Sequence, residues 1–140
     1  MTRNKAIATA AGIGLLVAGY LALTTPAVLE VTTDNVQAKV INSSRATIIM
    51  FSTEECGACQ EYAPTFQAAA EANTENIQFA HVNLNKYPDL NPGILKVPFT
   101  AIYVPDAGLL GGQFGALTAE QLADTAAAGV MLNELVHSHE

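Results

Sequence analysis

The chain has no tryptophan, only two cysteines and few basic residues, and each shortage excludes a class of protein. Two cysteines are too few for a scaffold held by disulfides, so a folded domain must rest on an apolar core. Six Lys and Arg stand against thirteen Asp and Glu, a formal net charge of −7. Nucleic-acid binding requires cationic groups that neutralise phosphates, so we expect no nucleic-acid partner. Half of the 140 residues are apolar, which excludes a disordered chain.

Motifs that indicate a bound nucleotide or a serine nucleophile are also missing. The sequence contains no G-x-x-x-x-G-K-[ST] phosphate loop and no G-x-S-x-G nucleophile turn. The glycines between Gly108 and Gly115 have neither the spacing of a dinucleotide fingerprint nor a suitable following helix. We therefore expect no organic cofactor and look for chemistry in the side chains themselves.

The N-terminal segment differs from the rest of the chain. Arg3 and Lys5 precede an uncharged run from Ala6 to Leu29, just long enough to span about 30 Å of hydrocarbon. Such a pattern is typical of a signal anchor or a cleaved signal peptide; cleavage after Ala27 is disfavoured by the preceding proline. The basic start places the N-terminus in the cytoplasm and the following domain outside, in a periplasm or its equivalent. We predict an anchor over residues 1–29, with a cleaved secreted form as the alternative, and a folded domain over residues 30–140.

The two cysteines lie in a distinctive stretch that begins at Thr47. An apolar, β-branched run ends in a small polar loop that carries Cys56 and Cys59, and a helix-forming segment follows from Glu61 to Ala72. Thiols spaced C-x-x-C at a strand-to-helix turn can close a disulfide on the first helical turn. The positive end of the helix dipole favours a thiolate at Cys56, and the thiolate is the attacking species in disulfide exchange.

Hydrophobic periodicity and turn residues predict the remaining elements. Thr118 and Gln121 have capping-box spacing at the start of the last helix. A strand–helix–strand crossover followed by a hairpin and a covering helix gives an α/β fold, with a mixed central sheet flanked by helices on both faces. The expected elements are a helix over 32–42, a strand over 45–51, a helix over 61–72, a strand over 77–84, a loop over 85–92, a turn of helix over 93–96, strands over 99–104 and 109–114, and a helix over 118–136.

From about residue 32 to 135, these motifs resemble the thioredoxin family. The turn Cys56-Gly57-Ala58-Cys59 is similar to the family's active-site turn, and Pro64 matches the kink in the helix that follows. Val97 and Pro98 match the family's cis-proline step, which presents a backbone edge to a substrate strand. The resemblance implies a thioredoxin-like fold, a redox-active Cys56–Cys59 pair and substrate binding at Val97 and Pro98.

Four departures from the family pattern bear on reactivity. Glu55 stands where the family usually has Trp, and Ala58 stands where it usually has Pro; with Gly57 these residues are expected to tune the redox pair. Met50 occupies the position of a buried Asp that relays protons to the second cysteine, and His81 replaces the accompanying Lys. His81 is a candidate for that proton transfer because imidazole titrates near neutral pH. The alternative, a histidine hydrogen-bonded to a neighbour or to water, is favoured by the sequence alone.

The predicted function is thiol–disulfide exchange with protein thiols and disulfides. Cys56 attacks a substrate disulfide and Cys59 resolves the mixed disulfide. Glu54 and Glu55 oppose the helix dipole, disfavour the Cys56 thiolate and thereby make the pair a weaker oxidant. We therefore expect a reductant, and an extracytoplasmic reductant needs a recycling partner that delivers electrons across the membrane.

Two other functions stay open. A non-catalytic thioredoxin-like adaptor would bind a partner through the Pro98 edge and keep its cysteines as a structural disulfide. The missing Asp and Trp favour this adaptor, whereas retention of both cysteines opposes it. The C-x-x-C pair is also half of a tetrahedral zinc set, which His81, His137 or His139 would have to complete. Because no second C-x-x-C exists, we expect no metal.

Overall fold

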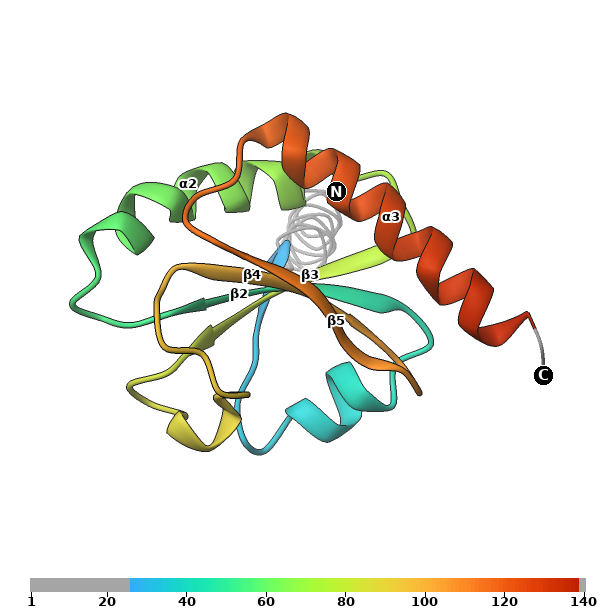
Figure 1. The fold of residues 1–140 in the computed structure, drawn as a ribbon, viewed down its shortest axis with the longest axis horizontal. Coiled ribbons are helices and arrows are strands. Elements are labelled where there is room, and N and C mark those ends of the chain that lie inside the picture. Colours follow the sequence, from blue (N-terminus) through green and yellow to red (C-terminus); the bar gives the residue numbers. More distant parts are fainter. Residues whose placement is uncertain (1–25, 139–140) are drawn as a thin grey trace, which may run out of the picture.

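A computed structural model describes residues 26–138 as a five-stranded mixed sheet with helices on both faces (Figure 1). The strand order is β1-β3-β2-β4-β5. β1 and β2 each pair in parallel with β3, and the pairs β2–β4 and β4–β5 are antiparallel. This architecture confirms the predicted α/β fold. The elements are β1 (Val28–Glu30), the π-helical turn η1 (Gln37–Ile41), β2 (Ala46–Ser52), α2 (Gly57–Ala72), β3 (Ile77–Asn83), the 3-10 turn η2 (Pro88–Leu90), β4 (Phe99–Val104), β5 (Gly108–Phe114) and α3 (Ala119–His137).

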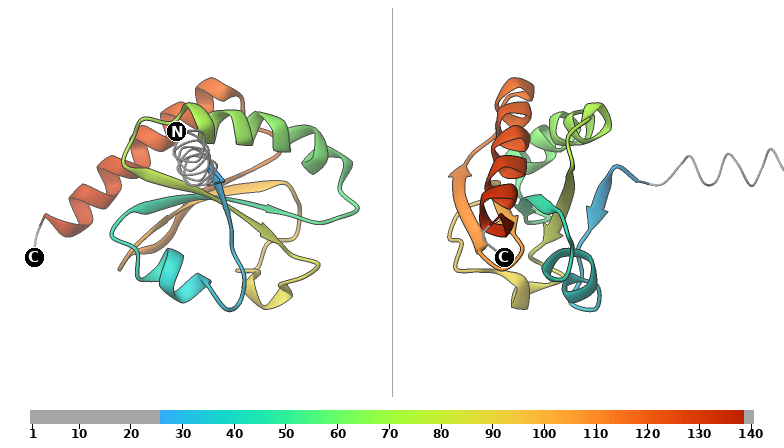
Figure 2. Two further views of the ribbon diagram at one scale, coloured as in Figure 1. Left: turned by 180° about the vertical axis from the view of Figure 1, so that it is seen from behind. Right: turned by 90° about the vertical axis from the view of Figure 1, so that its right-hand side faces the viewer.

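The central strand β2 is buried at all seven positions, as its apolar pattern predicts for a strand covered on both faces. Its side chains alternate between two cores. Ile48 and Met50 face the layer formed by α2 and α3, whereas Ile49 and Phe51 face the side that carries η1. Figure 2 shows α2 and α3 together on one side of the sheet and the short helix on the other. β2 therefore leads from the middle of the fold into the loop that ends at Cys56 and then into α2, which carries Cys59.

The N-terminal part of the sheet was not predicted. β1 forms the edge strand, in register with β3 from Val28 opposite Phe79 to Glu30 opposite His81. The sequence analysis placed Val28 and Leu29 in the apolar leading segment. The structure places them in the sheet. The strand was not predicted because three residues are too few to show an alternating pattern.

The predicted helix over residues 32–42 is much shorter in the structure. Thr32 and Asn35 form a reciprocal turn: the Thr32 N–H donates to Asn35 Oδ1 at 2.8 Å, and the Asn35 N–H donates to Thr32 Oγ1 at 3.1 Å. Such a reciprocal pair resembles a capping box, and the Val36 N–H donates a helical bond of 3.0 Å to the Thr32 carbonyl. Only Gln37–Ile41 then winds, as a π-helical turn.

Two other boundaries differ from expectation, while the last helix agrees. α2 begins at Gly57, directly after Cys56 and four residues before the expected start. The short helical turn between β3 and β4 lies at Pro88–Leu90 instead of residues 93–96, because a proline opens it. The capping box of α3 is confirmed, since Thr118 and Gln121 exchange both of its hydrogen bonds.

The predicted anchor lies mostly outside the described residues, which begin at residue 26. Within residues 26–138, no helix combines the length and the apolar character needed to cross a bilayer.

Candidate active site

The two cysteines form a disulfide at the N-terminus of α2. Their Cα atoms are 5.2 Å apart, and the Cys59 N–H donates a hydrogen bond of 3.1 Å to Cys56 Sγ. Cys56 is the N-cap of the helix and is half-buried, whereas Cys59, one turn in, is 3 % exposed. One sulfur is thus accessible to a substrate and the other is covered.

The helix start favours negative charge on Cys56 Sγ. No acidic residue occupies the first turn of the 16-residue helix α2, so its free N–H groups and dipole act on Cys56 unopposed from within the helix. Gln60 Nε2 donates a hydrogen bond of 3.2 Å to the Glu54 carbonyl, which ties the loop before α2 to the first turn of the helix.

Both glutamates that precede Cys56 accept hydrogen bonds from asparagines, one at the last residue of β3 and one in the loop that follows it. Asn83 Nδ2 donates to the Glu54 carboxylate at 3.2 Å, and Asn85 Nδ2 donates to the Glu55 carboxylate at 3.3 Å. Both glutamates are exposed, so salt and solvent screen their effect on Cys56. They oppose the helix dipole only weakly.

The segment before β4 lies beside the disulfide. The carbonyl oxygen of Val97 is 3.7 Å from Cys56 Sγ, and the Val97–Pro98 peptide bond is cis. The Pro98 carbonyl accepts a hydrogen bond of 2.9 Å from the Gly115 N–H, which holds this segment against the end of β5. The accessible sulfur is therefore next to a fixed stretch of backbone.

His81 is the centre of a hydrogen-bonded line on β3. Its Nδ1 lies 2.8 and 2.9 Å from the two carboxylate oxygens of Glu30, and its Nε2 lies 2.5 Å from Ser52 Oγ. Sequence reasoning identified His81 but missed Glu30 and Ser52, which are 51 and 29 residues away from it. The pairing register of β1, β2 and β3 brings the three side chains together, and this register cannot be read from the sequence.

A cleft of about 440 Å³ connects this line to the buried sulfur. Its walls come from β1, β2, β3 and α2. The residues that line it are Pro26, Val28, Glu30, Met50, Ser52, Cys59, Gln60, Ala63, Phe66, Gln67 and His81. Cys59 and His81 thus face a common space.

The structure does not bring together the ligands of a zinc site. Within residues 26–138, no group of three or more His, Cys, Asp or Glu side chains is arranged to hold a metal ion. His137 lies at the far end of α3, where its Nε2 is 3.1 Å from the Asp106 carboxylate, and His139 lies outside the described residues.

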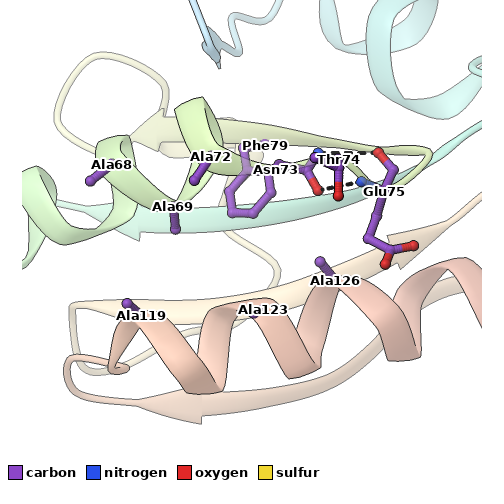
Figure 3. A pocket seen from close by; sticks show the side chains of 10 residues that line it. All are labelled: Ala68, Ala69, Ala72, Asn73, Thr74, Glu75, Phe79, Ala119, Ala123 and Ala126. Carbon is purple, nitrogen blue, oxygen red and sulfur yellow. Dashed lines mark hydrogen bonds between the residues drawn. The ribbon is translucent and has the colours of Figure 1, made fainter.

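A second hollow, of about 380 Å³, lies between α2 and α3 (Figure 3). Alanine methyl groups from both helices and the ring of Phe79 line most of it, and Asn73, Thr74 and Glu75 close one end. None of its lining residues is a thiol, a histidine or a lysine. We therefore place the chemistry at the cysteine pair.

Fold and site together define the class of the protein. A C-x-x-C pair at a helix N-terminus, with one sulfur accessible and the other covered, has the geometry of disulfide exchange. The protein is a thiol–disulfide oxidoreductase.

Comparison with known proteins gives the family: the chain belongs to the thioredoxin family, whose model matches residues 27–128. It is similar to a thioredoxin of Acidithiobacillus ferridurans, with 29% identity over 98 residues, 69% of this chain and 90% of that relative. It is also similar to a putative thioredoxin 2 of Streptomyces coelicolor, with 31% identity over 98 residues, 69% of this chain and 71% of the relative. A thioredoxin of Streptomyces clavuligerus is 28% identical over 76 residues.

Proposed function

We propose that this protein reduces disulfides of protein substrates outside the cytoplasm, with Cys56 as the attacking and Cys59 as the resolving cysteine. The observation that carries the proposal is the asymmetry of the pair. Cys56 is accessible and caps α2, whereas Cys59 is 3 % exposed. Only Cys56 is positioned to meet a sulfur of another protein.

The reaction has two exchange steps. The Cys56 thiolate attacks a substrate disulfide, forms a mixed disulfide and releases one substrate sulfur, which takes up a proton. The Cys59 thiol then loses its proton and attacks Cys56 Sγ, which releases the second substrate sulfur. Two electrons pass from the cysteine pair to the substrate, and the Cys56–Cys59 disulfide of this structure is the oxidised product.

Val97 and Pro98 supply the substrate-binding edge in this proposal. A substrate strand alongside this segment would place its disulfide next to Cys56 Sγ, because the Val97 carbonyl is 3.7 Å from that sulfur. Backbone hydrogen bonds give such a site affinity without demanding a particular side chain.

The reducing direction is supported by Glu54 and Glu55. Negative charge before Cys56 disfavours its thiolate and stabilises the disulfide relative to the dithiol, so the pair gives up electrons more readily. Their exposure makes the effect modest. A partner must return electrons to the pair after each turnover.

The extracytoplasmic location is supported by the leading segment alone. Arg3 and Lys5 before the uncharged run Ala6–Leu29 favour a membrane anchor with the domain on the outer side. Protease treatment of intact cells or spheroplasts tests this location, because an outer-side domain is digested without lysis. Release of the protein from washed membranes would indicate the cleaved form instead.

The reduction potential of the full-length chain tests the direction. After equilibration in dithiol and glutathione buffers, a value near about −270 mV supports a reductant, and one near about −120 mV supports an oxidant. The double variant Glu54→Gln/Glu55→Gln should have a less negative potential than wild type. Glu120→Gln, an acid in the first turn of α3, is the matched control and should leave the potential unchanged.

Cysteine variants test the two roles. Cys59→Ser should accumulate a mixed disulfide with a protein substrate, and Cys56→Ser should form none. Adducts formed equally by both variants would contradict the assigned order. If the wild-type pair showed no reversible couple, the non-catalytic adaptor that binds through the Pro98 edge would replace this proposal.

A further inference from the structure

Glu30, His81 and Ser52 form a row of hydrogen-bonded groups beside the resolving cysteine. The strand register builds this row: His81 of β3 lies opposite Glu30 of β1 on one side and opposite Met50 of β2 on the other. Residues opposite one another in a sheet share a face, and Met50 belongs to the core under α2. The imidazole is therefore on the α2 side of the sheet, where Cys59 lies.

The hydrogen bonds fix which nitrogen of His81 is free to take a proton. A carboxylate only accepts hydrogen bonds, so the 2.8 Å contact with Glu30 requires a hydrogen on Nδ1. In the neutral ring, Nε2 is then an acceptor, and its partner is the Ser52 hydroxyl. A hydroxyl both donates and accepts, so this contact persists when Nε2 becomes protonated.

The line ends in the cleft that Cys59 shares. Ser52 is 7 % exposed and the His81 side chain 18 %, while Glu30 at the outer end is 66 % exposed. The row thus runs from solvent to the cleft, whose volume of about 440 Å³ admits water molecules. Of the residues that line the cleft, those that titrate are Glu30, His81 and Cys59.

We propose that His81 accepts the proton of the Cys59 thiol through the Ser52 hydroxyl in the resolving step, with Glu30 as a positioning residue. The proposal rests on the thiol chemistry above and applies in either redox direction. A water molecule in the cleft takes up the Cys59 proton and gives one to Ser52 Oγ as the Ser52 proton moves to His81 Nε2. The Cys59 thiolate then attacks Cys56 Sγ, the Cys56–substrate bond breaks, and the substrate thiolate takes a proton from solvent. In the reverse direction the imidazolium returns the proton to Cys59.

Met50 leaves β2 without a basic side chain at this point of the cleft. The Cys59 thiol is buried and must lose a proton before it can attack, and the Met50 thioether beside it in the cleft cannot accept one. His81 lies opposite Met50 on the neighbouring strand. The base that the cleft offers is thus on β3, one strand away from Met50.

A serine, a histidine and a carboxylate also serve as nucleophile, base and orienting group in hydrolases. Here Ser52 Oγ is covered at the end of a central strand, and the reactive group in the same cleft is a thiol. The geometry favours proton transfer over acyl transfer by Ser52.

Single-turnover kinetics of the full-length protein test the relay. The reduced protein is mixed with a peptide disulfide that carries a fluorophore and a quencher, and mixed-disulfide formation and resolution are followed separately between about pH 6 and about pH 9.5. His81→Gln should slow resolution at least about tenfold at pH 7, since general-base catalysis is worth that much or more. The deficit should shrink toward pH 9.5, where hydroxide ionises the thiol. Formation of the mixed disulfide should change less than about twofold.

Three further variants sharpen the result. His137→Gln removes the other described histidine that faces a carboxylate, at the far end of α3, and should match wild type at every pH. Ser52→Ala should reproduce the His81→Gln defect and keeps the test decisive if His81→Gln does not fold. Glu30→Gln should also slow resolution, because its amide can donate to Nδ1 and select the tautomer in which Nε2 is no acceptor.

The outcomes separate the relay from the proposed function. If His81→Gln and Ser52→Ala resolve at the wild-type rate at every pH, or if both steps slow equally, the relay is refuted. A wild-type protein that forms no mixed disulfide refutes the proposed function instead.

Discussion

The hydrogen bond between Tyr62 and Thr100 ties α2 to the sheet and gives a quantitative prediction. Tyr62 Oη lies 2.9 Å from Thr100 Oγ1, with the side chains 2 % and 3 % exposed. Tyr62→Phe leaves the Thr100 hydroxyl buried without this partner, and Thr100→Val removes the same partner from the phenol, which keeps its hydrogen bond from the Leu117 backbone. Each single change should lower the free energy of unfolding by about 1–2 kcal/mol.

The double variant should be much less destabilised than the sum of the two single variants. Replacing both partners by apolar groups of similar shape leaves no orphaned hydroxyl. We expect a coupling energy of about 1 kcal/mol, and a melting temperature about 4 °C lower in each single variant. Chemical denaturation of the four proteins measures the cycle. Tyr103→Phe, on a half-buried tyrosine of β4, is the control and should cost less than about 0.5 kcal/mol.

The same phenol makes stability depend on alkaline pH. Burial raises the pKa of Tyr62, and hydrogen bonds from Thr100 and from the Leu117 backbone offset this only in part. Below about pH 10 the tyrosine is neutral in both states. Above that pH the unfolded chain ionises first, so Tyr62 should lower stability progressively as pH rises toward its folded pKa.

Tyr62→Phe should therefore flatten the loss of stability above about pH 10, whereas Thr100→Val should not. An identical alkaline slope in wild type and Tyr62→Phe would refute the burial argument. Additive single-variant effects in the cycle would refute the hydrogen-bond argument.

Three further changes test the packing of the fold by thermal or chemical denaturation. Thr118→Ala removes the N-cap hydroxyl of α3 and should cost about 1 kcal/mol; a loss below about 0.3 kcal/mol would show that the cap is dispensable. Leu122→Ala, at 0 % exposure, should cost about 2–5 kcal/mol, against less than about 0.5 kcal/mol for Leu95→Ala at 95 % exposure. Gly112→Ala places a methyl group on the Phe99 ring and should cost about 1–3 kcal/mol, and an unchanged midpoint would contradict that contact.

Elements whose signal is local were predictable from the sequence. The strand before Cys56 is a continuous apolar run, and the structure confirms it as the buried centre of the sheet. The capping box at Thr118 is confirmed because its four residues contain both partners of both hydrogen bonds. The C-x-x-C pair was found for the same reason, since its function depends on residues three apart.

Features that depend on register were not predictable. β1 has three residues and no internal pattern, so nothing marked Val28–Glu30 as a strand. Without β1 there is no reason to place Glu30 beside His81, and the sequence alone favoured a histidine of no chemical role. The helix expected over residues 32–42 was located but its length and type were not, because hydrophobic spacing does not distinguish a π-helical turn of five residues from a longer α-helix.

The shortness of β1 has a consequence for local opening. An edge strand of three residues, paired on one side only, should exchange its amide hydrogens at a much lower free energy than β2 or β3. Its detachment would withdraw the Glu30 carboxylate from His81 and leave the turn that carries Cys56 in place. Tension applied to the N-terminal side of the domain would act on this strand first. In the proposed relay, opening of β1 would slow proton transfer from Cys59 and leave the reactivity of Cys56 unchanged.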